Sequence, residues 1–125
     1  MNSIQRSTFN TEIVRAKRHY FSGDLEAGFV HLERAHILGQ TEVLPHVTVH
    51  WLMFLFELRQ RRPAAVVGQA VRIVLGALGS AVGIVPIGNT GGTNISMFKR
   101  MPVAQDLQSI IDGRVPSKGS QNSKR

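Results

Sequence analysis

The chain of 125 residues contains no cysteine. This absence excludes disulfide scaffolds, zinc sites built on thiolates, iron–sulfur clusters and thiol nucleophiles. The first eight residues, Met-Asn-Ser-Ile-Gln-Arg-Ser-Thr, also lack the basic-then-apolar run of a secretory signal peptide. We therefore expect a cytoplasmic protein, and the residues that narrow its function are its histidines.

Acidic residues are scarce, since eight Asp and Glu face fifteen Lys and Arg and leave a net charge of +7. The last thirteen residues contain four basic residues, no acid and many Ser, Gly, Gln and Asn. Such a composition cannot bury enough apolar area to offset its ordering entropy. The chain as a whole is 42% hydrophobic, enough for a core. We predict one helical domain over 1–112 and a flexible basic tail over 113–125, with nucleic-acid binding unlikely as the main role.

Apolar residues recur at helical spacing through most of the chain, which predicts an all-α fold. The expected helices cover 8–20, 25–38, 45–60, 64–78 and a short segment opening at Pro102. Thr8, Asn10 or Thr11 is expected to cap the first helix, and Asp24 the second. Gly39 is expected to end the second helix as a left-handed C-cap. The result is a small bundle of two helix hairpins.

The segment 64–86 is rich in Val, Ile, Leu, Ala and Gly. Its simplest interpretation is a helix buried in a four-helix core, although peripheral membrane contact or dimerisation stays open. The following stretch IGNTGGTNIS (87–96) is a Gly/Asn-rich loop. We expect its glycines to adopt positive φ, and Asn89 and Asn94 to bond backbone groups.

The first hairpin resembles a tetratricopeptide repeat. Ala16, Gly28 and Ala35 are small residues at positions where two helices would cross closely, and Gly23-Asp24 forms a tight turn. One such unit cannot bury its apolar face alone, and no second copy follows at the expected spacing. The resemblance implies a repeat-like hairpin rather than an array.

Over most of its length the chain also resembles a small bacterial family, domain of unknown function 3703. The resemblance rests on HLERAHILGQ (31–40), PHVTVHW (45–51) and PIGNTGGTNISMFKRMPV (86–103), three blocks in the same order. It covers about 16–107. Members of this family often occur beside heavy-metal resistance determinants, so the resemblance implies a metal-linked role. It supplies no catalytic residues.

Four of the five histidines lie within twenty residues. His46 and His50 are four residues apart, hence about 40° apart on one helix face, where two imidazoles can share a metal ion. Glu33 and His36 have the spacing of the Glu-x-x-His ligands of carboxylate-bridged metal bundles. Because the connection from residue 39 to residue 45 is short, the two helices should be antiparallel neighbours. Glu33, His36, His46 and His50 are then predicted to converge beneath that loop.

Three histidines and one carboxylate suit Zn²⁺, Cu²⁺, Ni²⁺ or Fe²⁺ by ligand type. Met53, on the same stripe as His46, tilts the choice slightly toward copper. His31 is the substitute ligand if the helical phase differs. The sequence has no His-Glu-x-x-His motif and no Gly-x-Ser-x-Gly motif, so binding or buffering of a metal is favoured over catalysis.

A second hypothesis assigns the histidines no metal. In it the protein is a tetratricopeptide-like interaction module that holds a protein partner or forms a homodimer, and the histidines are structural or interfacial. Replacement of His46 and His50 by alanine separates the two hypotheses, because it would abolish metal uptake under the first and leave partner binding largely intact under the second.

Overall fold

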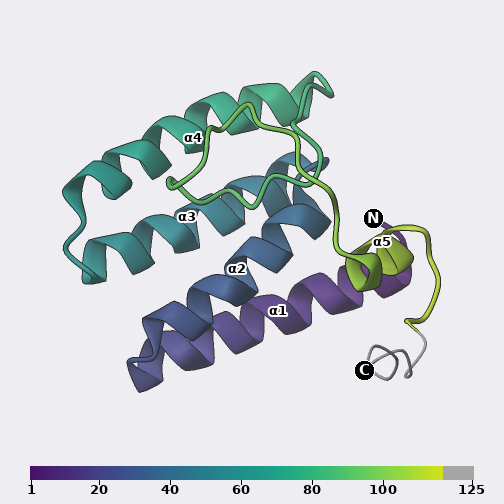
Figure 1. Cartoon of the computed structure of the whole chain (residues 1–125), viewed down its shortest axis with the longest axis horizontal. Coiled ribbons are helices and arrows are strands. Elements are labelled where there is room, and N and C mark those ends of the chain that lie inside the picture. Colours follow the sequence, from purple (N-terminus) through teal and green to yellow (C-terminus); the bar gives the residue numbers. More distant parts are fainter. Residues whose placement is uncertain (117–125) are drawn as a thin grey trace, which may run out of the picture.

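The computed structural model describes residues 1–116, and every regular element in that range is a helix. The helices are α1 (Ser3–Ser22), α2 (Leu25–Gly39), α3 (Val43–Arg59), α4 (Pro63–Ala81) and α5 (Gln105–Ile111). α1 and α2 form one hairpin, α3 and α4 form another, and the two meet where α2 packs on α3 (Figure 1). The predicted all-α fold with two hairpins and a short last helix is confirmed. From residue 117 on, the predicted tail lies outside the described residues.

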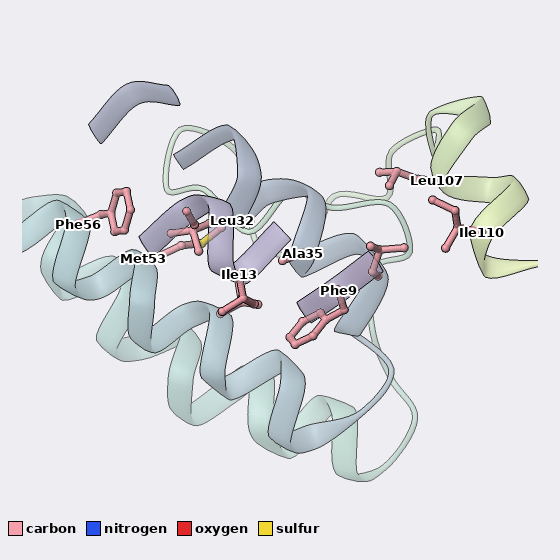
Figure 2. Packing of buried hydrophobic residues seen from close by; sticks show 11 residues of the cluster. Phe9, Ile13, Leu32, Ala35, Met53, Phe56, Leu107 and Ile110 are labelled. Carbon is pink, nitrogen blue, oxygen red and sulfur yellow. The ribbon is translucent and has the colours of Figure 1, made fainter. Parts of the chain in front are cut away.

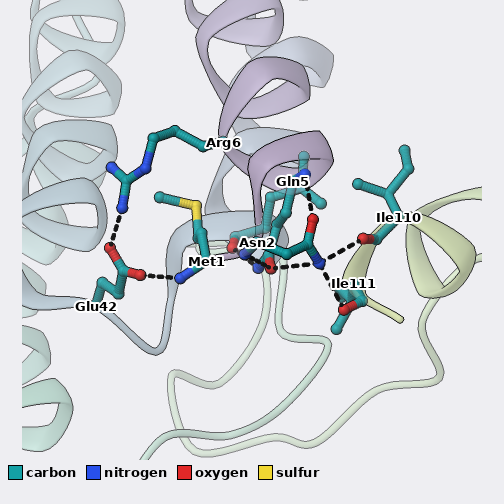
Figure 3. Close-up of polar contacts among 8 residues, drawn as sticks. Met1, Asn2, Gln5, Arg6, Glu42, Ile110 and Ile111 are labelled. Carbon is teal, nitrogen blue, oxygen red and sulfur yellow. Dashed lines mark hydrogen bonds and ion pairs between the residues drawn. The ribbon is translucent and has the colours of Figure 1, made fainter. Parts of the chain in front are cut away.

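The first helix begins at Ser3, five residues before the expected start. Asn2 caps it, because its Oδ1 accepts from the amide of Gln5 at 2.8 Å while the Gln5 side chain accepts from the amide of Asn2. Asn2 Nδ2 also donates to the carbonyls of Ile110 and Ile111, which ties α1 to α5 (Figure 3). The caps predicted at residues 8–11 were wrong, since Thr8 lies inside the helix and bonds back to the carbonyl four residues earlier.

The hairpin of α1 and α2 turns at Gly23, whose φ of +87° suits a residue without a Cβ, and Asp24 caps α2 as predicted. Gly28 lets α2 approach its neighbours, because a Cβ there would lie 2.6 Å from the ring of Phe56. Gly39, however, is the last residue of α2 and not a left-handed cap. Glycine is required there because a Cβ would lie 2.8 Å from the ring of Phe9 and would clash with it.

The hydrophobic core lies between α1, α2, α3 and α5 (Figure 2). Leu32, Met53 and Phe56 are at most 1% exposed, and each such buried side chain contributes about 1.5–3 kcal/mol relative to an exposed one. The full cluster is Phe9, Ile13, Ala16, Leu32, Ala35, Leu38, Val49, Met53, Phe56, Leu107 and Ile110. It contains no residue of α4.

The expectation that the 64–86 segment is a core helix was therefore wrong. The residues of α4 that are buried are polar, namely Gln69, Arg72 and Ser80, whereas its large apolar residues are mostly exposed. Among the described residues, α4 is also the one helix long and apolar enough to cross a membrane by length and composition. The polar side of α4 faces the interior because α3 and the loop after α4 present polar groups to it.

The loop after α4 runs back along that helix and is fastened to it by Arg72 (Figure 1). The guanidinium donates to the carbonyls of Gly91 at 2.9 Å and Ile95 at 2.6 Å. Asn89 Nδ2 donates to two further loop carbonyls. Gly88 and Gly91 have the positive φ that the sequence predicted, whereas Gly92 does not. The last helix begins at Gln105 rather than at residue 102, and the residue before it, Ala104, has a non-helical backbone with ψ of 144°. The loop between α4 and α5 lies over one end of α2.

Candidate metal centre

Three histidines meet in the interior where the end of α2 faces the first turns of α3. The Nε2 atoms of His36 and His46 are 2.9 Å apart, and each lies 3.1 Å from Nε2 of His50. All three side chains are buried. Four-residue spacing places His46 and His50 on one face of α3, and packing of α2 on α3 brings His36 to them. The predicted convergence of these three histidines is present in the structure.

The opposite ring nitrogen of each histidine has a defined hydrogen-bond partner. His36 Nδ1 lies 2.7 Å from the carbonyl oxygen of Asn89, and His50 Nδ1 lies 2.8 Å from Oε1 of Gln69. Both partners accept hydrogen bonds only, so both Nδ1 atoms carry the proton. The Gln69 amide is oriented by its NH₂ group, which donates to the carbonyl of Gly91 at 3.1 Å.

His46 follows the same pattern through a hydroxyl. Its Nδ1 is hydrogen-bonded to Ser80 Oγ, and that hydroxyl donates its own proton to the carbonyl of Gln40 at 2.9 Å. Ser80 therefore accepts from His46, whose Nδ1 is the protonated nitrogen. Ser80 thereby orients the ring of His46.

These partners fix the tautomer of all three rings, and three Nε2 lone pairs point at one another with no proton between them. Neutral imidazoles in this arrangement cannot hydrogen-bond to each other through Nε2. A single cation at the centre would accept all three lone pairs. Hydrogen bonds from Nδ1 to a carbonyl, amide or hydroxyl oxygen are the usual second layer of metal-ligating histidines.

Burial keeps the rings in the neutral form that binds metals. Removal from water lowers the pKa of His46 and of His50 to about 4, in His50 against the opposing effect of the Gln69 hydrogen bond. Burial also lowers the pKa of His36 well below its ordinary value, and the neighbouring His50 and His46 lower it further. At neutral pH no proton therefore competes for the Nε2 atoms.

The spacing of the three nitrogens fits a transition metal with a small adjustment. Zinc–imidazole bonds of about 2.0–2.1 Å in a tetrahedral arrangement place the nitrogens roughly 3.3–3.4 Å apart. The triangle of Nε2 atoms would have to expand by a few tenths of an ångström. Rotation of the rings about their side-chain bonds provides such a change.

The cluster borders a pocket of about 850 Å³ lined by α4 and the loop after it. Its walls are mostly apolar, and Arg72, Asn89 and Gln40 contribute polar groups. The Oε1 atom of Gln40 is buried and has no hydrogen-bond partner among the described residues. Three protein ligands beside an open space leave at least one coordination position for a small ligand.

Two other predicted ligands lie outside this cluster. Glu33 is half-buried and lines a separate pocket together with Glu57, and burial raises its pKa. His31 faces α1, where its Nδ1 lies 2.6 Å from Glu12 Oε2 and its ring stacks on His19. The structure thus brings together the three histidines without the carboxylate. Three-residue spacing turns Glu33 about 60° from His36 on α2, toward the start of α4.

The residues that orient the histidines were not identified from the sequence as part of a site. Gln69 and Ser80 are polar residues in an otherwise apolar helix, and this contrast is the signal that could have indicated them. Met53 is close to the site, but its sulfur accepts from the Gln69 amide at 3.6 Å. Asn89 bonds loop backbone through its side chain, as predicted, and His36 through its carbonyl.

The chain belongs to a family described as protein of unknown function (DUF3703), whose model matches residues 3–111. The match runs from the first residue of α1 to the last of α5, so it includes both hairpins and the histidine cluster. No curated protein and no solved structure matches the chain. The resemblance noted in the sequence is confirmed, and the family description assigns no function.

Proposed function

We propose that this member of the DUF3703 family binds one transition-metal ion through the Nε2 atoms of His36, His46 and His50. The observation that carries the proposal is the convergence of three Nε2 atoms within 3.1 Å of one another, in rings whose Nδ1 atoms are each hydrogen-bonded to an oxygen. A buried arrangement of lone pairs is unfavourable without a cation. The ion would supply the missing electrostatic partner.

The donor set suits Zn²⁺, Cu²⁺, Ni²⁺ or Fe²⁺, because neutral imidazole binds all of them. Three neutral ligands leave the charge of the ion uncompensated, and Arg72 adds positive charge nearby. We infer that a fourth ligand is supplied from the adjoining pocket, where the unpartnered Oε1 of Gln40 can accept a hydrogen bond from bound water.

We assign the site to metal binding or buffering rather than to catalysis. The polar residues that line the pocket within the described part of the chain are the three histidines, Gln40, Arg72, Asn89 and Arg100. None of them is a carboxylate that could act as a general base beside the ion. The mostly apolar walls fit a site that retains an ion and admits one small ligand beside it.

The test is elemental analysis of the untagged protein, purified without chelator, followed by competition titration with Zn²⁺, Cu²⁺ and Ni²⁺. We expect one equivalent of metal per chain. His46→Gln and His50→Gln should each weaken binding by at least a hundredfold, because they remove a ligand while keeping a polar side chain. His31→Gln, on α2 but outside the cluster, is the matched control and should bind like the wild type.

Two results would overturn the proposal. One is micromolar or weaker uptake of all three ions by the folded wild-type protein. The other is a double variant, His46→Gln with His50→Gln, that still binds one equivalent as tightly as the wild type. Circular dichroism of each variant shows whether the helices are intact, so that a loss of binding is not confused with unfolding.

A further inference from the structure

The outer face of α4 is apolar along the whole helix. After Pro63 its exposed residues are Ala64, Val67, Ala70, Val71, Val74, Leu75, Leu78 and Ala81, and Val82 continues the stripe. Val67, Val74 and Leu78 are each at least 60% exposed. A face of this length without one charged or polar residue marks a contact surface on a soluble protein.

We propose that this face, named here the α4 face, pairs in antiparallel orientation with the α4 face of a second copy. Six of its exposed residues follow the alternating three- and four-residue spacing of a two-helix seam. They are Ala64, Val67, Val71, Val74, Leu78 and Ala81. The spacing reads 3-4-3-4-3 and is therefore the same from either end.

This symmetry makes the α4 face complementary to itself. When two copies run antiparallel about a central two-fold axis, Val71 lies opposite the partner copy's Val74, and Val67 lies opposite Leu78. The small residues Ala64 and Ala81 then meet at both ends, where the helices can approach closely. A two-fold interface requires such a self-complementary patch.

The charges beside α4 also favour antiparallel pairing. Arg61 and Arg62 are exposed just before the helix. Parallel pairing would place the arginines of both copies together. Antiparallel pairing separates them by the helix length of about 28 Å, well beyond the Debye length of about 8–10 Å at physiological salt. The opposed helix dipoles add to this preference.

A lipid surface fits the α4 face less well. Helices that lie in a membrane interface carry Lys or Arg on a polar face beside the apolar one. The one basic residue of α4, Arg72, is buried and donates to loop carbonyls instead. If α4 spanned a membrane, the exposed polar residues Asn94 and Ser96 of the loop alongside it would face hydrocarbon.

The first experiment measures the mass of the full chain by analytical ultracentrifugation, with metal removed by chelator so that the result does not depend on the histidine site. One helix pair is small beside a typical interface of roughly 1,600 Å², so we expect a dimer that dissociates on dilution through the micromolar range. Val71→Glu should be monomeric throughout. The matched control is Val14→Glu on α1, since the two valines are 46% and 48% exposed.

Cysteine cross-linking then tests the orientation, and the absence of native cysteine makes the background clean. Val67→Cys protein mixed with Leu78→Cys protein should form a disulfide-linked pair on oxidation. Val67→Cys alone should not, because eleven residues separate positions 67 and 78 and place the two cysteines roughly 16 Å apart. Cross-linking of Val67→Cys with itself, in preference to the mixture, would overturn the antiparallel arrangement.

The proposal as a whole is overturned if the wild-type chain stays monomeric at all concentrations, or if Val71→Glu and Val14→Glu dimerise alike. Flotation with vesicles of phosphatidylcholine and phosphatidylserine is a second test of the dimer proposal. Binding of monomeric wild-type protein that is lost in Val71→Glu would assign the α4 face to lipid. Circular dichroism should show folded helices in both variants, because both valines are exposed.

Discussion

Replacement of Gln69 by leucine should weaken metal binding while leaving all three ligands in place. Gln69 is fully buried, and its Oε1 accepts the Nδ1 proton of His50 at 2.8 Å. Without this acceptor, the His50 proton can move to Nε2 and form a hydrogen bond to the neighbouring His36 or His46. That tautomer cannot bind a metal through Nε2, so metal binding would have to reverse the change.

The expected loss is 10- to 100-fold in metal affinity, the range for removal of a partner behind a ligating histidine. This corresponds to about 1.4–2.8 kcal/mol, similar to the roughly 1–3 kcal/mol cost of one unsatisfied buried donor. The carbonyl of Gly91 keeps a donor, because Arg72 also bonds it at 2.9 Å. Gln69→Glu should bind metal at least as tightly as the wild type, since a carboxylate is a stronger acceptor for His50.

The assay is competition for Zn²⁺ against a chromophoric chelator at pH 7, together with thermal unfolding of the metal-free variants. Gln5→Leu is the matched control, because it removes a buried hydrogen bond of 2.6 Å to the carbonyl of Leu38, and the other hydrogen bonds of the Gln5 side chain go to Asn2. It should lower Tm without changing zinc affinity. The reasoning is refuted if Gln69→Leu and Gln5→Leu lower Tm alike and both bind zinc within twofold of the wild type.

The metal-free protein should lose stability as the pH falls from about 6.5 toward 4, because burial lowers the pKa of His46 and His50 to about 4 and the unfolded chain then binds more protons. Denaturant titrations should give a larger free energy of unfolding at pH 7 than at pH 5, and equal values would contradict the buried neutral state. Gly91→Ala should weaken zinc binding at least tenfold, because a Cβ there would lie 2.7 Å from His36 Cδ2. Gly83→Ala has the same left-handed φ but nothing within 4 Å, so it should lose stability alone; equal zinc affinity of the two variants would refute the contact.

The fold class and half of the candidate site followed from local patterns in the sequence. Helical periodicity located both hairpins, and Asp24 marked the start of α2 because its capping preference acts within one turn. The start of α3 was expected at residue 45 and lies at Val43. The same geometry placed His46 and His50 on one face of α3. The short connection between α2 and α3 then brought His36 within reach, since it allows few arrangements of the two helices.

Tertiary packing decided which face of each helix is buried. Periodicity groups the residues of α4 into two faces, and the hydrophobic rule assigns the apolar face to the interior. In the structure the polar face of α4 is the buried one. It meets His46, His50 and a loop whose carbonyls need hydrogen-bond donors. Gln69, Arg72 and Ser80 are therefore buried on that face. The exclusion of Glu33 has the same origin: a rotation of about 60° on α2 directs it to a different neighbour. The sequence determined the spacing of the histidines along each helix. The groups that accept hydrogen bonds from their Nδ1 atoms come from residues 19 to 53 positions away in the chain, so only the tertiary structure could place them.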